Sequence, residues 1–153
     1  MQNTPFYVEA IEEMSSICRQ IYPNAPWLTL DKFVQRSRRA KWVIVDIRPQ
    51  SERAVSIIPG ALSLDEFKAR GKKRPGEYDG KSILIYCTAG CRSARYAMQL
   101  CESGFQAFNL YGGILAWALD GKSFATPNGE TTRRVHVYSA NWDTLPPGYE
   151  AVC

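Results

Sequence analysis

The sequence predicts an α/β domain with a mainly parallel central sheet and helices on both faces. Three short apolar runs predict strands at residues 42–46, 83–87 and 105–110. Their continuous hydrophobicity is typical of strands buried on both faces of a parallel sheet. Helical stretches separate the runs, and this alternation indicates right-handed crossovers that place helices against the sheet.

The helices between these strands are expected at residues 51–56, 64–70 and 93–102, the last ended by Gly104. Before the first of these strands, Thr29 is a suitable N-cap for a helix that continues to about Arg38. The polar segment 71–80 is rich in turn-forming residues and is expected to be a surface loop.

The length of 153 residues, 45% of them hydrophobic, is enough for one domain with extensions. We expect an N-terminal helical extension over residues 1–26, the main domain over 27–124 and an aromatic-rich tail over 125–153. The tail holds too many apolar groups to remain in water, so it should dock on its own domain or on a partner chain, which makes a homodimer possible. Its apolar and aromatic residues are Val135, Val137, Tyr138, Trp142, Leu145 and Tyr149.

Composition excludes several classes of protein. The net charge of +4 is moderate, and a basic run at residues 36–41 suits a solvated helix end, so nucleic acid is an unlikely partner. No signal-like start or apolar run of about 18 residues is present, so we expect a cytoplasmic protein with no membrane contact. Five scattered cysteines favour a reducing compartment over a disulfide framework. Because His136 is the only histidine and no Cys-x-x-Cys pair occurs, no metal site is expected.

The loop from Cys87 to Ser93 carries the expected chemistry. It follows a buried-type strand and precedes a helical pattern, which places the Cys87 thiol at a helix N-terminus. Unpaired backbone N–H groups there stabilise an anion, so we expect a nucleophilic thiolate. The small residues Ala89 and Gly90 allow the loop amides to curl around the sulfur as an anion-binding nest. Asp46 ends the preceding predicted strand and should lie at the same edge of the sheet.

Four motifs in this sequence resemble the single-domain rhodaneses, the thiosulfate sulfurtransferases. They lie at residues 87–93, 45–48 with Glu52, 58–61 and 110–117. They occur in the order seen in that family and cover about residues 29–124. One departure is Ser56-Ile57, where the family often has Gly-His. The resemblance implies a three-layer rhodanese-like domain with about five strands.

The resemblance also implies a mechanism that needs no cofactor. The Cys87 thiolate takes a sulfane sulfur from a small donor such as thiosulfate, and a cyanide, thiol or protein acceptor then removes it from the persulfide. Cys87 is the expected catalytic residue, and Asp46, Arg48 and Arg95 are expected to support the site. The expected substrate-binding residues are Thr88, Ala89, Gly90, Cys91, Arg92 and Ser93.

Some assignments stay open at this point. Cys91 is either a loop filler or a second thiol that attacks the sulfur on Cys87 to give a Cys87–Cys91 disulfide. Arg48 and Glu52 are expected to form a structural ion pair. Cys18 and Cys101 sit in helical apolar patterns and are expected in the core.

Two rival functions remain beside sulfur transfer. One is a redox, protein-interaction or regulatory module on the same scaffold. The other is a cysteine phosphatase, whose related loop needs five residues between cysteine and arginine. Here only four residues separate Cys87 from Arg92, and Ser93 occupies the place that the arginine would need. Phosphatase activity is therefore the weaker of the two rivals.

Overall fold

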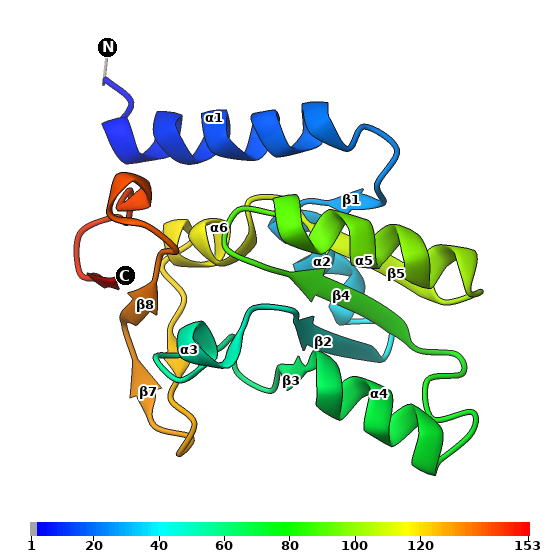
Figure 1. Cartoon of the computed structure of the whole chain (residues 1–153). Coiled ribbons are helices and arrows are strands. Elements are labelled where there is room, and N and C mark those ends of the chain that lie inside the picture. The colour runs from blue at the N-terminus through cyan, green and yellow to red at the C-terminus, as the bar shows by residue number, and fades with distance from the viewer. Residues whose placement is uncertain (1–2) are drawn as a thin grey trace.

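The computed structural model describes residues 3–153 and has a five-stranded parallel sheet at its centre (Figure 1). The strand order is β1-β5-β4-β2-β3, and each neighbouring pair is parallel. The strands are β1 (Trp27–Leu28), β2 (Trp42–Asp46), β3 (Leu62–Ser63), β4 (Ser82–Tyr86) and β5 (Gln106–Leu110). The predicted α/β class and parallel sheet are confirmed, and the two shortest strands are the ones that hydrophobic runs did not indicate.

The helices form a layer on each face of the sheet. They are α1 (Phe6–Ile21), α2 (Leu30–Ser37), α3 (Gln50–Arg53), α4 (Leu64–Lys73), α5 (Cys91–Glu102) and α6 (Gly113–Leu119). On one face α4 and α5 pack on the apolar residues Ile83 and Ile85, and on the other α2 and α6 pack on Leu84 and Tyr86. Burial on both faces explains why the strands read as continuous apolar runs.

The segment expected to be a surface loop is partly structural. Helix α4 continues to Lys73, and Tyr78 is buried with its ring stacked on Phe67. The Tyr78 hydroxyl donates a hydrogen bond to the Phe67 carbonyl oxygen at 2.7 Å. Turn-forming residues predicted the change of direction but not this anchor. The expected helix at 51–56 is also shorter and ends at Arg53.

The C-terminal tail packs against its own chain. Strands β6 (Phe124–Ala125) and β7 (Thr131–Thr132) form an antiparallel pair. Strand β8 (Arg134–His136) pairs in parallel with β9 (Glu150–Val152). The short 3-10 helix η1 (Ala140–Trp142) lies between β8 and β9 in the sequence. Val135 and Val137 have no exposed surface. The Ser56 hydroxyl donates to the Arg134 carbonyl oxygen at 2.6 Å, and the next residue, Ile57, bridges Ala125. The Ser56-Ile57 departure from the family pattern is thus where the tail attaches.

Helix α1 lies beyond the β1 edge of the sheet and contacts both α5 and α6 (Figure 1). A disulfide joins Cys18 of α1 to Cys91, the first residue of α5. The sequence favoured a reducing compartment over a disulfide framework and did not predict this bond, because the two cysteines are 73 residues apart in sequence and only the docking of α1 brings them together. Cys18 is buried as expected, but Cys101 is exposed and not in the core. No helix within residues 3–153 is long and apolar enough to cross a membrane.

Candidate active site

The sulfur of Cys87 lies in a short loop between β4 and α5. Gly90 adopts φ +114°, a left-handed conformation that turns the chain into α5. The sulfur accepts a hydrogen bond from the Gly90 N–H at 3.2 Å and one from the Ser93 hydroxyl at 3.2 Å. Cys87 is only 1% exposed. Two donors therefore converge on a sulfur that is withdrawn from solvent, and donors of this kind offset the cost that burial imposes on an anion at that position.

Three carbonyl groups of the loop accept hydrogen bonds from α6 and β5. The carbonyl oxygens of Cys87 and Thr88 accept from the N–H groups of Ile114 and Leu115 in α6, at 3.1 and 3.3 Å. The Gly90 carbonyl accepts from the Asn109 side-chain amide at 3.0 Å. In a trans peptide the N–H points opposite to the C=O, and the chain contains no cis peptide bond within residues 3–153. The N–H groups that follow these carbonyls therefore point away from α6 and β5.

Gly113 allows α6 to approach the loop this closely. It has φ +51°, and a Cβ placed there would overlap the backbone carbonyls of Cys87 and Thr88. Any side chain at this position would separate α6 from the loop and weaken both hydrogen bonds. The glycine pair at 112–113 thus positions the loop through the first turn of α6.

An ion pair fixes the other side of the loop. Arg92 donates to both carboxylate oxygens of Glu52, at 2.7 and 3.0 Å, and to the Thr88 hydroxyl at 2.9 Å. Burial opposes the charge of Glu52, but the hydrogen bonds and positive charge of Arg92 outweigh it and hold the pKa of Glu52 below its ordinary value. Burial likewise opposes the charge of Arg92, but the hydrogen bonds to Glu52 and the proximity of Cys87 and Glu52 raise the pKa of Arg92.

A second buried network lies one strand away. Asp46 accepts from the Arg48 side chain at 3.0 and 2.9 Å and from the Tyr86 hydroxyl at 2.7 Å. Burial opposes the charge of Arg48, but Asp46 outweighs it and raises the pKa of Arg48. The expected Arg48–Glu52 ion pair was wrong. Arg48 pairs with Asp46, while Glu52, at the start of α3, pairs with Arg92.

The tail contributes two residues that sequence patterns did not connect with the site. The Tyr138 ring lies 4.8 Å from the Arg92 guanidinium carbon, and Tyr138 has φ +76°, unusual for a residue with a side chain. His136 Nδ1 accepts from the Tyr138 N–H at 3.1 Å and lies 3.9 Å from Glu52 Oε1. Asn109 was missed as well, although a polar residue inside an apolar strand run was a visible signal.

The remaining predicted site residues lie on the outer side of the loop. Cys91 is bonded to Cys18 and Cys87 is a free thiol, so the structure holds no Cys87–Cys91 bond. Arg95 is exposed on α5 and lines a pocket of about 500 Å³ with Cys91 and Arg92. Residues 3–153 contain no group of three or more His, Cys, Asp or Glu side chains that could hold a metal ion.

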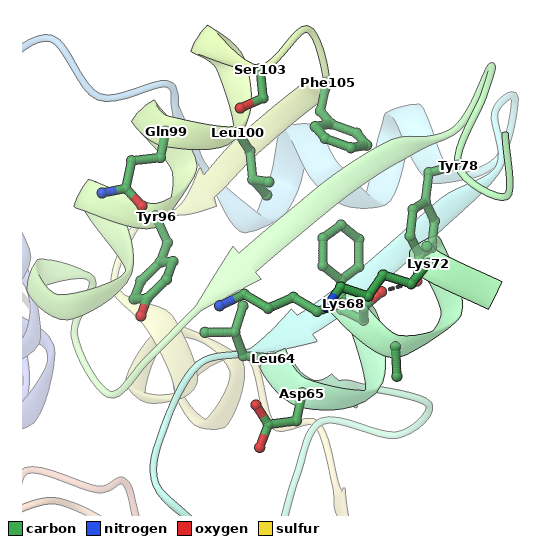
Figure 2. A pocket seen from close by; sticks show the side chains of 13 residues that line it. Leu64, Asp65, Lys68, Lys72, Tyr78, Tyr96, Gln99, Leu100, Ser103 and Phe105 are labelled. Atoms are coloured by element: carbon green, nitrogen blue, oxygen red, sulfur yellow. Dashed lines mark hydrogen bonds between the residues drawn. The ribbon is translucent and has the colours of Figure 1, made fainter. Parts of the chain in front are cut away.

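A larger pocket, of about 750 Å³, lies between α4 and α5 and is separate from Cys87 (Figure 2). Tyr78, Leu100 and Phe105 give it an apolar wall, and Lys68 and Asp65 reach its edge. No residue of the 87–93 loop lines it. The candidate chemistry therefore belongs to the buried loop and not to this larger pocket.

Residues 29–120 match the family described as the rhodanese-like domain. The chain belongs to this family. A protein of Allochromatium vinosum named "Sulfurtransferase" is 37% identical over 90 residues, covering 57% of this chain and 81% of the relative. This rhodanese-like chain is also 31% identical over 81 residues to a tRNA uridine(34) hydroxylase of Agrobacterium fabrum. That match covers 49% of this chain but only 26% of the longer relative.

The fold of this rhodanese-like domain is shared with solved structures. The thiosulfate sulfurtransferase of Pseudomonas aeruginosa superimposes with a TM-score of 0.58 at 22% identity, covering 88% of this chain and 26% of that one. At this identity the likeness shows the fold alone. The predicted family and three-layer architecture are confirmed.

Proposed function

We propose that this rhodanese-like protein is a sulfurtransferase that carries a sulfane sulfur as a persulfide on Cys87. The observation that carries the proposal is the environment of the Cys87 sulfur, on which the Gly90 N–H and the Ser93 hydroxyl converge. A thiolate held by fixed donors is a nucleophile, and the same donors stabilise the terminal sulfur anion of a persulfide. The name of the Allochromatium relative supports the same class of reaction.

Thiosulfate is a donor whose chemistry fits the site. The Cys87 thiolate attacks the outer sulfur of thiosulfate, the sulfur–sulfur bond of the donor breaks, and sulfite leaves with the bonding electron pair. A nucleophilic acceptor, cyanide or a thiolate, then attacks the outer sulfur of the persulfide and releases the Cys87 thiolate. Both steps displace a sulfur anion, so neither needs a metal, a cofactor or a general base. The two half-reactions predict ping-pong kinetics.

The loop residues would act mainly through their backbone and their mutual contacts. The amides from Thr88 to Ser93 would hold the transferred sulfur. Arg92 is a positioning residue in this scheme, because Glu52 and Thr88 already receive the hydrogen bonds it donates. Its charge adds positive potential beside Cys87. Asp46 and Arg48 would support the end of the sheet, and Arg95 would attract anionic donors to the outer side of the loop.

The loop length argues against phosphate esters as substrates. Four residues between Cys87 and Arg92 leave a smaller cradle than a phosphatase loop of five, and Arg92 is engaged with Glu52. A bound phosphate would need that arginine as a bidentate donor. We therefore expect thiosulfate turnover without phosphatase activity.

The test is the formation of thiocyanate from thiosulfate and cyanide. The wild-type protein should produce thiocyanate, and Cys87→Ser should produce none. A Cys101→Ser variant is the matched control, because Cys101 is a free cysteine on the exposed side of α5, and it should keep the wild-type rate. An unchanged rate of thiocyanate formation in Cys87→Ser would refute the assignment of Cys87 as the sulfur-carrying nucleophile.

A further inference from the structure

The disulfide between Cys18 and Cys91 stands beside the candidate active site but does not include its nucleophile. Cys91 is four positions after Cys87 and begins α5, and its Cα lies 4.8 Å from that of Cys18. Cys87 remains a free thiol. Residues 87–91 thus carry one free thiol and one end of a disulfide.

The two residues of this disulfide differ in their exposure to solvent. Cys18 is 2% exposed and packs in an apolar cluster with Ile11 and Leu115. Cys91 is only partly buried and lines the pocket of about 500 Å³ that opens on the outer side of α5. An attacking thiolate must reach the sulfur that it bonds to, so access favours Cys91.

The pocket at Cys91 favours negative charge. Arg92 and Arg95 line it together with Tyr22, Tyr96 and Gln99, and none of these five lining residues is acidic. Arg92 shares its charge with Glu52, whereas Arg95 is exposed and has no carboxylate within 4.0 Å among residues 3–153. The first turn of the 12-residue helix α5 adds the partial positive charge of its N–H groups.

We propose that Cys91 is a thiol-exchange site for small anionic thiols. The incoming thiolate forms a bond to the Cys91 sulfur, the Cys18–Cys91 bond breaks, and Cys18 leaves with the electron pair as a thiolate that takes up a proton. The product is a mixed disulfide on Cys91. A second thiolate can then release the small molecule as its own disulfide and leave Cys91 reduced. No oxidant beyond the existing disulfide is needed.

Leaving-group ability opposes attack on the Cys91 sulfur and favours attack on Cys18. Attack on Cys18 would expel Cys91 as the leaving thiolate, and a thiolate at a helix N-terminus is a better leaving group. That preference acts only on molecules that can approach Cys18, which is covered by the packing of α1 on α5 and α6. Burial of Cys18 therefore decides the site of attack.

The test uses the full chain with Cys87→Ser, Cys101→Ser and Cys153→Ser, which leaves Cys18 and Cys91 as the only cysteines. Because Cys87 is absent, the result does not depend on the proposed sulfur transfer. The oxidised protein is treated with 3-mercaptopropionate, 2-mercaptoethanol or cysteamine, which are anionic, neutral and cationic. Acid quenching, maleimide alkylation and peptide mass mapping then locate the adduct. Each rate is divided by the rate of the same thiol on the urea-unfolded protein, which cancels intrinsic reactivity.

We expect the adduct on Cys91 and a normalised rate about fivefold higher for 3-mercaptopropionate than for 2-mercaptoethanol, with cysteamine slowest. Raising the salt concentration should reduce the differences between the normalised rates of the three thiols. Arg95→Gln should remove most of the rate difference among the three thiols. Arg38→Gln, at the end of α2 on the opposite face, should preserve this difference. An adduct on Cys18, equal normalised rates for the three thiols, or two free thiols that persist after diamide oxidation would each overturn the proposal.

Discussion

Arg92 donates two hydrogen bonds to Glu52, at 2.7 and 3.0 Å, and so links the cysteine loop to α3. The Glu52 side chain is 4% exposed and that of Arg92 is 33% exposed, so this pair is shielded on one side only. Arg92 also donates to Thr88, the residue directly after Cys87. The conformation of the loop therefore depends on a carboxylate from a segment about 40 residues earlier in the chain.

Replacing Glu52 tests this dependence. Glu52→Gln keeps the shape of the side chain but leaves Arg92 half-buried without its counter-charge. We expect a loss of about 2 kcal/mol in the free energy of unfolding and a fall of at least about tenfold in thiocyanate formation. Urea unfolding and the thiocyanate assay measure the two effects. The exposed Glu130→Gln is the control, and equal behaviour of the two variants would argue against a positioning role for this ion pair.

The same carboxylate predicts how stability changes with pH. The pKa of Glu52 is lower in the folded protein than in the unfolded chain, where it is about 4.3. Its ionised form therefore stabilises the fold fully above that value, and the contribution is lost as the pH falls toward the folded pKa. Between pH 5 and pH 3 the free energy of unfolding should drop more steeply for the wild type than for Glu52→Gln. Parallel curves would contradict the prediction.

The contact between α6 and the loop predicts an unusually costly glycine replacement. Gly113→Ala would place a methyl group against the carbonyls of Cys87 and Thr88, whereas Gly121→Ala meets no atom within 4 Å, and both residues have positive φ. The Gly121 variant should lose about 1 kcal/mol from backbone strain alone. The Gly113 variant should lose about 3 kcal/mol or more and most of its sulfur transfer. Thermal unfolding and thiocyanate assays compare the two, and similar losses would show that the loop tolerates a shift of α6.

The Ser93 hydroxyl contacts the sulfur directly. Ser93→Ala removes the hydrogen bond to Cys87 and should slow thiocyanate formation about tenfold, the effect of about 1.4 kcal/mol of lost anion stabilisation. Ser15→Ala is a matched control, because Ser15 is equally buried but its hydroxyl donates to the Ile11 carbonyl. A Ser93 variant no slower than the Ser15 variant would exclude the hydroxyl from the chemistry.

The sequence was most informative where local patterns determine structure. Apolar runs located β2, β4 and β5, and Thr29 did cap α2, with its hydroxyl accepting from the Lys32 N–H at 3.4 Å. The position of Cys87 between a strand and a helix was also readable from residue order. These features depend on neighbours in sequence, where periodicity and capping preferences apply.

The sequence was least informative where the chain returns to the loop from a distance. Nothing near Cys18 indicates its bond to Cys91, and nothing near Tyr138 indicates its place over Arg92. Glu52 was expected to pair with Arg48, yet in the structure Glu52 pairs with Arg92. Such contacts depend on the packing of whole elements, which local patterns do not encode.

Persulfide formation on Cys87 is measured most directly by the mass of the intact protein after incubation with thiosulfate and removal of the small molecules. The wild-type protein should gain about 32 Da, one sulfur atom, located on Cys87 by peptide mapping, lost on addition of cyanide and absent from Cys87→Ser. A wild-type protein that gains no sulfur, or a Cys87→Ser variant that gains as much, would show that Cys87 does not carry a persulfide.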